Sequence, residues 1–269
     1  MKAKKERLDV LLTEKGYFQS REKAKAAIMA GIVFVNGAKT DKAGTAVDAD
    51  CEINIKENIC PYVSRGGLKL EKALELYGFS LENAVCADIG ASTGGFTDCM
   101  LQKGADKVFA IDVGYGQLDW KLRNDDRVVN MEKCNIRYLD FDTIDKDIDF
   151  ISIDVSFISL KLVFPVAAKM LSDTGSLVCL VKPQFEAGRQ QVGKGGIVKD
   201  IAVHREVIRN VVQYGAEAGL YSYGLTYSPV KGAKGNIEYL LYMKKEDKDG
   251  KITEEDIYAT AAVSHEELK

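Results

Sequence analysis

Apolar and polar positions alternate with two different periods between residue 62 and about residue 245. Seven short apolar runs have the length and composition of strands, and they are 84–89, 107–113, 128–132, 148–155, 176–181, 221–227 and 237–243. Helical spacing of apolar residues lies between most of them, notably over 68–77, 160–171 and 201–219. This order predicts a parallel, doubly wound α/β sheet for the first five strands. Only residues 228–236 separate the last two strands, which is too short for a crossover helix, so this pair is expected to be antiparallel.

The first 60 residues have an organisation of their own. A short helix is expected to begin at Arg7-Leu8-Asp9, a second helix to span 21–30, and a strand to follow over 32–35. A return strand and a further strand near 51–55 complete the pattern. Residues suited to caps, helix stops and a hairpin turn stand at the boundaries: Gly16, Ser20, Gly31, Asn36 and Gly37. The segment therefore predicts a small α+β unit with two helices packed on a sheet.

Composition is that of a soluble globular protein. The 269 residues are 46% hydrophobic and 29% charged, with a net charge of −3. No apolar run reaches the roughly 18 residues of a membrane helix and no secretion leader opens the chain, so a cytoplasmic protein is expected. The six cysteines are scattered and histidines number only two, so no metal and no disulfide framework is expected. Residues 1–25 carry eight basic and four acidic side chains, a weak sign of a basic module.

The stretch Ala87–Phe96, Ala-Asp-Ile-Gly-Ala-Ser-Thr-Gly-Gly-Phe, has the character of a nucleotide-binding turn. Small residues let the backbone approach a ligand, and Asp112 at the end of the next strand can accept both hydroxyls of a ribose. Ser92 occupies the second glycine position of a dinucleotide fingerprint, where a pyrophosphate needs bare backbone. Asp88 would repel phosphates and attract a sulfonium cation. These residues favour S-adenosylmethionine, and NAD stays as the weaker alternative.

Ionisable or polar residues end several of the predicted strands. Ligands of open α/β sheets bind outside the carboxyl ends of the strands. The residues read at these ends are Asp88, Asp112, Asn135, Asp154 and Lys182. A charge at the end of an apolar run is costly unless a ligand or a partner pairs with it. These positions are therefore candidate site residues, with strand-end charges that simply reach solvent as the alternative.

The pattern of the first unit resembles the S4-type RNA-binding domain. The match runs from Arg7-Leu8-Asp9 through Ser20-Arg21-x-x-Ala24-x-x-x-Ile28-x-x-Gly31-x-Val33-x-Val35-Asn36-Gly37 and covers most of residues 5–55. In that family the second helix and the following turn face RNA. The resemblance implies RNA contacts at Arg7, Ser20, Arg21, Lys25 and Asn36. Arg65, in the segment that joins the two units, is added as a further candidate contact. A solvated helix face is the alternative for Arg21 and Lys25.

Four charged residues far apart in the sequence resemble the Lys-Asp-Lys-Glu tetrad of 2′-O-RNA methyltransferases: Lys69, Asp154, Lys182 and Glu238. The segments 90–97, 154–157 and 181–186 extend the match. With an S4-type domain in front, nearly the whole chain resembles the TlyA family of rRNA cytidine-2′-O-methyltransferases, often named haemolysins, which have an FtsJ-like catalytic domain. The resemblance implies a Rossmann-like class I methyltransferase fold, a mostly parallel seven-stranded sheet with an antiparallel last strand. It also implies S-adenosylmethionine as methyl donor, and ribosomal RNA or ribosomal subunits as partner.

The same resemblance implies a role for each of the site residues. Lys182 would accept the proton of the 2′-hydroxyl or stabilise the alkoxide, while the other tetrad members orient it and balance its charge. The donor pocket would be shaped by Asp88, Gly90, Ser92, Gly94, Phe96, Asp112, Val113, Asn135 and Asp154. Within it, Asp112 would hold the donor's ribose and Asn135 would lie near the adenine.

The expected organisation is an S4-type domain over 1–60, a linker over 61–67, a methyltransferase domain over 68–245 and a charged tail over 246–269. The tail is expected to be partly disordered or to form a final helix over 254–262. Gly188-x-x-x-x-Gly193-Lys194-Gly195 approaches a phosphate-binding loop, but Gly195 lacks the hydroxyl that would bind Mg²⁺, so ATP is disfavoured. A basic loop over RNA, with Arg189, Lys194 and Lys199, and an ordinary flexible connection both stay open.

Three other functions remain as alternatives. A non-catalytic RNA-binding assembly factor would keep the fold, although the intact tetrad argues against it. A pseudouridine synthase would carry a Gly-Arg-Leu-Asp segment, but Arg-Leu-Asp occurs only at residues 7–9. A membrane-lytic toxin, which the haemolysin name suggests, has little support in a chain without a spanning segment.

Overall fold

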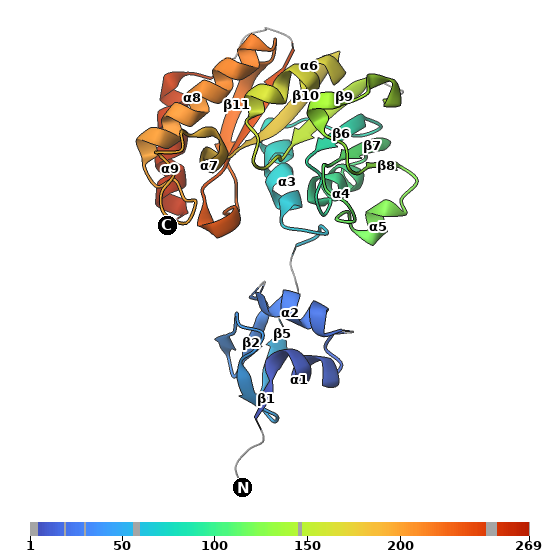
Figure 1. Ribbon diagram of the computed structural model, residues 1–269, viewed down its shortest axis with the longest axis vertical. Coiled ribbons are helices and arrows are strands. Elements are labelled where there is room, and N and C mark those ends of the chain that lie inside the picture. The colour runs from blue at the N-terminus through green and yellow to red at the C-terminus, as the bar shows by residue number, and fades with distance from the viewer. Residues whose placement is uncertain are drawn as a thin grey trace. The chain divides into compact units, whose positions relative to one another are not determined.

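The computed structural model describes residues 5–18, 20–29, 31–55, 60–144, 147–245 and 252–268. The chain divides into two compact units, Met1–Pro61 and Tyr62–Lys269 (Figure 1). Each unit has its own hydrophobic core.

The described residues of the first unit form seven short elements. They are β1 (Lys5–Arg7), α1 (Leu8–Glu14), α2 (Arg21–Met29), β2 (Val33–Val35), β3 (Ala38–Lys39), β4 (Ala46–Asp48) and β5 (Ile53–Ile55). Strand β2 pairs antiparallel with β3 and β5, and Asn36 and Gly37 make the turn between β2 and β3 with φ of 49° and 77°. The two predicted helices and this hairpin are confirmed, although Ala30, the expected last residue of the second helix, lies outside the described residues. The β1–β4 pair was not predicted, because strands of three residues rich in charge carry no alternating apolar signal.

A seven-stranded sheet is the centre of the second unit. Its strands are β6 (Val85–Ile89), β7 (Lys107–Ile111), β8 (Val128–Met131), β9 (Ile148–Ile153), β10 (Leu171–Val181), β11 (Tyr221–Tyr227) and β12 (Tyr239–Lys244). Their order in the sheet is β11-β12-β10-β9-β6-β7-β8. Strands β6 to β10 pair in parallel, whereas β12 is antiparallel to both of its neighbours. The predicted Rossmann-like sheet with an antiparallel last strand is therefore confirmed.

The ends of the strands differ from the prediction in ways that matter for the site. Strands β7 and β9 end two residues earlier than expected, so Asp112 and Asp154 stand just beyond the sheet rather than within it. Strand β10 begins at Leu171, five residues earlier than expected, with an irregular register between Leu171 and Ser176. Paired strands that end level with one another bring the residues that follow them to one edge.

Seven α-helices and four short 3₁₀ segments accompany the described strands of this unit, with α3 before the first strand and α9 after the last. The α-helices are α3 (Gly66–Tyr77), α4 (Gly95–Gln102), α5 (Trp120–Arg123), α6 (Phe164–Met170), α7 (Pro183–Glu186), α8 (Ile201–Glu217) and α9 (Glu254–Glu267). The 3₁₀ segments are Ile136–Tyr138, Phe141–Thr143, Leu160–Leu162 and Ala233–Gly235. The single helix expected over 160–171 is wrong: a 3₁₀ turn comes first, and Pro165, which suits the first turn of a helix, lies at the start of α6.

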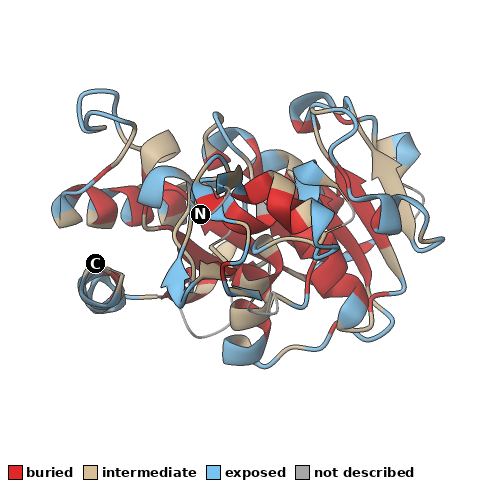
Figure 2. Cartoon of the chain, turned by 90° about the horizontal axis from the view of Figure 1, so that it is seen from below, coloured by how far each residue is buried: buried red, intermediate tan, exposed pale blue. Residues whose placement is uncertain are grey.

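Buried residues run along the central strands and the inner helix faces (Figure 2). Helix α9 belongs to this core, because Ile257, Ala261 and Ser264 are buried and the helix packs against α8 and β11. A capping box between Thr253 and Asp256 begins it, so a helix is present where the tail was expected to be helical or disordered. Residues 246–251 of that tail lie outside the described residues. Among the helices of the described residues, none is both long enough and apolar enough to cross a membrane.

Candidate active site

The turn after β6 is built for close backbone approach. Gly90 has φ of 90°, and a Cβ atom there would lie 2.6 Å from the carbonyl oxygen of Asp154. Gly94 also has φ of 90°, and it precedes the first residue of α4. Ser92 adopts φ of 49°, a conformation that costs a side-chain-bearing residue some free energy and persists only when its surroundings hold it. The predicted small-residue turn is therefore a tight and specific backbone arrangement.

Asp112 holds this turn from the end of β7. Its Oδ2 accepts a hydrogen bond from the backbone N–H of Ser92 at 2.8 Å, and its Oδ1 accepts one from Gly114 at 2.6 Å. Each carboxylate oxygen keeps a second lone pair for another donor. Asp112 lines a cavity of about 730 Å³ together with Ser92, Val113 and Asn135. The structure thus brings together four residues expected at the donor pocket.

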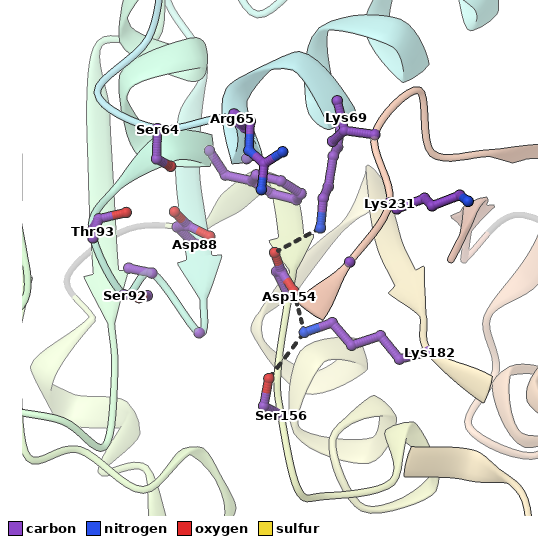
Figure 3. A pocket seen from close by; sticks show the side chains of 16 residues that line it. Ser64, Arg65, Lys69, Asp88, Ser92, Thr93, Asp154, Ser156, Lys182 and Lys231 are labelled. Atoms are coloured by element: carbon purple, nitrogen blue, oxygen red, sulfur yellow. Dashed lines mark hydrogen bonds and ion pairs between the residues drawn. The ribbon is translucent and has the colours of Figure 1, made fainter. Parts of the chain in front are cut away.

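Asp88 is directed into the protein rather than presented only to a ligand. Its side chain is fully buried, and its Oδ2 accepts hydrogen bonds from the backbone N–H of Thr97 at 2.9 Å and from the Thr97 hydroxyl at 2.7 Å. Its Oδ1 accepts a third from the hydroxyl of Ser152 at 3.0 Å. Burial raises the pKa of Asp88 to about 7. The carboxyl group therefore ties the start of α4 to β6 and β9, and Asp88 is also one of the residues that line a cavity at this edge of the sheet (Figure 3).

The four tetrad residues converge at one edge of the sheet, as Figure 3 shows for three of them. Asp154 lies 2.6 Å from Nζ of Lys182 through Oδ1 and 3.9 Å from Nζ of Lys69 through Oδ2. Lys69 donates to Oε2 of Glu238 at 2.7 Å. Both lysines are buried to about nine-tenths, with 9% and 8% of their surface exposed. Two cations and two carboxylates thus form one continuous, charge-balanced network.

Two polar side chains extend this network at its ends. Ser156 accepts a hydrogen bond from Nζ of Lys182 at 3.0 Å, and Nε2 of Gln184 donates to Oε1 of Glu238 at 3.2 Å. Neither residue was assigned a role from sequence. Both residues lie in segments that extend the family match, 154–157 and 181–186, and this was the signal available for them.

A second cavity of about 340 Å³ adjoins the first. It is lined by Arg65, Lys69, Phe96 and Lys182, together with residues of the turn and of the loop 230–232. Four residues line both cavities, namely Gly90, Ser92, Asp154 and Ser156. In Figure 3 the side chains of Arg65 and Lys69 come from the same helical segment, on the side of the cavity opposite Ser156. The tetrad therefore stands at the boundary between two neighbouring hollows.

The other candidate RNA contacts lie in the first unit, and two of them, Arg7 and Arg21, pair with a buried acid. Asp9 is fully buried and pairs with Arg7 at 3.0 Å and with Arg21 at 2.9 Å, which holds the pKa of this carboxyl well below its usual range. Both arginines are about half exposed. Lys25 on the same helix is partly buried.

The remaining two candidates of this unit have structural partners. The hydroxyl of Ser20 accepts the backbone N–H of Lys23 at 3.3 Å, as expected of an N-cap. Oδ1 of Asn36 accepts the backbone N–H of Glu52 at 3.0 Å.

Comparison with known families agrees with this geometry. Residues 62–245 match the family of FtsJ-like methyltransferases, and residues 6–53 match the S4 domain. The chain belongs to the FtsJ-like methyltransferase family. The predicted combination of an S4 domain and a methyltransferase domain is confirmed, and NAD and pseudouridine synthase chemistry have no support from these matches.

Similar proteins align with nearly the whole length of this chain. It is 50% identical to YqxC of Bacillus subtilis, a protein provisionally named an rRNA methyltransferase, over 100% of this chain and 97% of that protein. It is 41% identical to the 16S/23S rRNA (cytidine-2′-O)-methyltransferase TlyA of Mycobacterium tuberculosis, over 90% and 91% of the two chains. A solved structure from Streptococcus thermophilus, provisionally named a hemolysin, is 48% identical with a TM-score of 0.79 over 98% and 97%. The predicted resemblance to the TlyA family is confirmed.

The buried carboxyl of Asp88 predicts a pH-dependent stability of the second unit. Its folded-state pKa of about 7 lies above the ordinary value of about 3.9, so its stabilisation is full below pH 4 and is lost as the pH rises through 7. The free energy of unfolding, measured by urea titration, should fall between about pH 4 and pH 7 in the wild type. Asp88→Asn should remove much of this slope. Glu186→Gln is the companion variant, because burial raises the pKa of Glu186 as well. An unchanged slope in both variants would contradict the assignment.

Proposed function

We propose that this protein transfers the methyl group of S-adenosylmethionine to the 2′-hydroxyl of a ribose in ribosomal RNA, with cytidine as the target nucleotide. The observation that carries the proposal is the Lys69–Asp154–Lys182–Glu238 network at the boundary between two cavities. One cavity has the features of a donor site, and the other has the features of an acceptor site.

The larger cavity fits the donor. Asp112 keeps two free lone pairs for the hydroxyls of the donor's ribose, and Asn135 lines the same cavity where an adenine would extend. Gly90 lets the turn pack directly against the backbone of Asp154, which a side chain there would meet, and so fixes the shape of the cavity wall. Gly94 and Phe96 shape the turn and its buried flank. Asp88 lines the neighbouring smaller cavity and is hydrogen-bonded to Thr97 and Ser152, and we propose that it positions the start of α4 rather than binding the donor directly.

The smaller cavity fits the ribose to be methylated. Bound S-adenosylmethionine would supply an electrophilic methyl group on a sulfonium centre. In the transfer a bond forms between the 2′-oxygen and the methyl carbon, the bond from sulfur to that carbon breaks, and the hydroxyl proton leaves. Nζ of Lys182 donates a hydrogen bond to the hydroxyl of Ser156 and forms an ion pair with Asp154 at 2.6 Å. A remaining position on Nζ can hydrogen-bond the 2′-oxygen, and accept its proton when the amine is neutral or stabilise the oxyanion when it is charged.

Lys69 and Glu238 complete the proposed chemistry as positioning groups. Lys69 bridges Glu238 and Asp154, so it fixes the carboxylate that in turn fixes Lys182. A balanced set of buried charges also avoids the cost of an isolated ion next to the reacting atoms. Most of the rate is then expected from holding the reacting atoms in line, which is sensitive to displacements of about 1 Å.

Ribosomal RNA as substrate follows from the two-unit organisation and from the relatives. The S4 domain presents Arg7 and Arg21 half exposed on one surface, where Asp9 holds both guanidinium groups in place. TlyA of Mycobacterium tuberculosis, an rRNA (cytidine-2′-O)-methyltransferase by name, shares 41% of its residues with this chain. We propose that these arginines, with Lys25 and Arg65, contact the RNA.

Replacement of Lys182 tests the reaction. Purified protein is incubated with methyl-labelled S-adenosylmethionine and with ribosomal subunits from cells that lack this gene. Lys182→Ala should lower transfer by roughly 10²- to 10⁴-fold, the range of a lost proton-transfer or oxyanion group, while donor binding stays within about threefold. Label should lie at a position that resists alkaline cleavage. Lys161→Ala, which changes an exposed lysine, is the control. Binding of donor and RNA without transfer by the wild type would point to the assembly factor instead.

Replacement of Ser156 tests whether its hydroxyl positions Lys182. Loss of one hydrogen bond to a charged group should lower kcat about tenfold in Ser156→Ala, with little change in KM for donor or RNA. Ser156→Thr keeps the hydroxyl and should restore most of kcat. A purely structural role predicts instead that stability falls and that both variants lose activity alike.

A pair of glycines tests the donor cavity. Gly90→Ala should weaken binding of S-adenosylhomocysteine, measured by calorimetry, by about tenfold or more, because the new Cβ strains φ and also meets the Asp154 backbone. Gly78→Ala is the matched control, since Gly78 has φ of 64° but open space around its Cβ position. Equal binding by the two variants would contradict the proposed donor site.

A further inference from the structure

Two loops of the second unit carry a cluster of cations that the proposed chemistry does not use. Residues 187–200 connect α7 to α8, and residues 228–238 connect β11 to β12. Their basic side chains are Arg189, Lys194, Lys199, Lys231 and Lys234, of which only Lys231 is partly buried. Within the described part of the chain, none of these five side chains has an ion pair or a side-chain hydrogen bond. The loops also contain few acids: Glu238 is buried in the tetrad, and Asp200 caps α8.

A single buried side chain fastens the two loops together. Asn236 is 3% exposed; its Nδ2 donates to the carbonyl of Gly196 at 2.9 Å, and its Oδ1 accepts the backbone N–H of Val198 at 3.2 Å. His204 on α8 adds a third anchor, through Nε2 to the carbonyl of Val198 at 2.9 Å. A Cβ atom at Gly196 would lie 3.6 Å from Nζ of Lys234, so the two loops are in close contact. The expected alternative of an ordinary flexible connection does not fit this degree of anchoring.

The clamped loops also form part of the site. Lys231 and Gly232 line the proposed acceptor cavity. The backbone N–H of Gly232 donates to the carbonyl of Asn236 at 2.9 Å, and a side chain at Gly232 would overlap the carboxylate of Glu238. In Figure 3 the side chain of Lys231 points away from Lys69 and Asp154, so it does not join the tetrad. A displacement of this loop would therefore also displace Glu238, which follows Asn236 by two residues.

We propose that these five cations form an RNA-binding surface that holds the phosphates next to the target nucleotide, and that Asn236 is the positioning residue that keeps this surface in register with Glu238. The inference rests on the proposed function. Unpaired cations on two joined loops, one of which reaches the cavity through Lys231, attract a polyanion, and phosphate contacts fix the register of a nucleic acid without reading its sequence. Because the chain as a whole carries a net charge of −3, a local excess of this kind is not a result of its composition.

The salt dependence of RNA binding tests the surface. The triple variant Lys194→Ala/Lys231→Ala/Lys234→Ala is compared with Lys103→Ala/Lys107→Ala/Lys169→Ala, which removes the same charge near the amino ends of the strands. The probe is unmodified ribosomal subunits, titrated from 50 to 200 mM salt. Each lost phosphate contact lowers the slope of log K against log salt by about 0.7 to 0.9. The slope of the first variant should therefore be smaller by about 2, and this variant should bind the subunits about tenfold more weakly. Equal slopes for the two triple variants would overturn the proposal.

Asn236→Ala tests the clamp without removing a charge. The substitution should lower the slope of log K against log salt by at least about 1, and it should also lower kcat. The melting temperature of the variant shows whether the second unit stays folded. A folded Asn236→Ala protein with wild-type slope and kcat would remove Asn236 from the proposal. If this variant does not fold, the triple lysine variant still tests the surface.

The two proposals fail in different ways. Wild-type protein that transfers no methyl group, combined with a reduced slope in the lysine variant, would overturn the 2′-O-methyltransferase proposal and support the surface. Wild-type protein that methylates the subunits, combined with an unchanged slope and KM in the lysine variant, would overturn the surface alone.

Discussion

The carboxylate of Asp154 is the group on which the rest of the site depends. It touches both buried lysines, and the carbonyl of the same residue limits what can stand at Gly90 in the donor turn. Without it, Lys182 would lose its ion pair and Lys69 would keep only Glu238, and breaking a buried ion pair in this way costs several kcal/mol. One residue therefore sets the geometry of the turn, the lysine pair and the boundary between the cavities.

The sheet explains why four distant residues meet at this point. Ile89 and Ile153 are register partners, so β6 and β9 end level and Asp154 follows directly, its N–H bonded to the carbonyl of Ile89. Strand β12 runs the other way, so it begins where its neighbours end; Tyr239 is opposite Val181, which places Glu238 beside Lys182. The antiparallel last strand is thus a structural requirement for a tetrad whose fourth member precedes a strand.

Sequence could predict the residues at strand ends but not those that reach them from elsewhere. Asp112 and Lys182 follow buried apolar runs, and parallel strands end at one edge, so their convergence follows from general rules. Lys69 on a helix and Glu238 after a loop have no local signal, and only family resemblance identified them. Asp88 was expected to face a ligand; its three hydrogen bonds come from Thr97 and Ser152, on elements whose packing the sequence does not specify.

The charged residues that serve the methyl transfer are different from those that attract the RNA. The tetrad contains two cations and two anions, all close together, so it contributes almost no field at a distance. The chain is net acidic, which would repel RNA at long range. Attraction must therefore come from cations outside the tetrad, on surfaces where neighbouring acids do not cancel them. The basic side chains of loops 187–200 and 228–238 meet this condition within the catalytic unit, whereas the two half-exposed arginines of the S4 domain share their charge with Asp9.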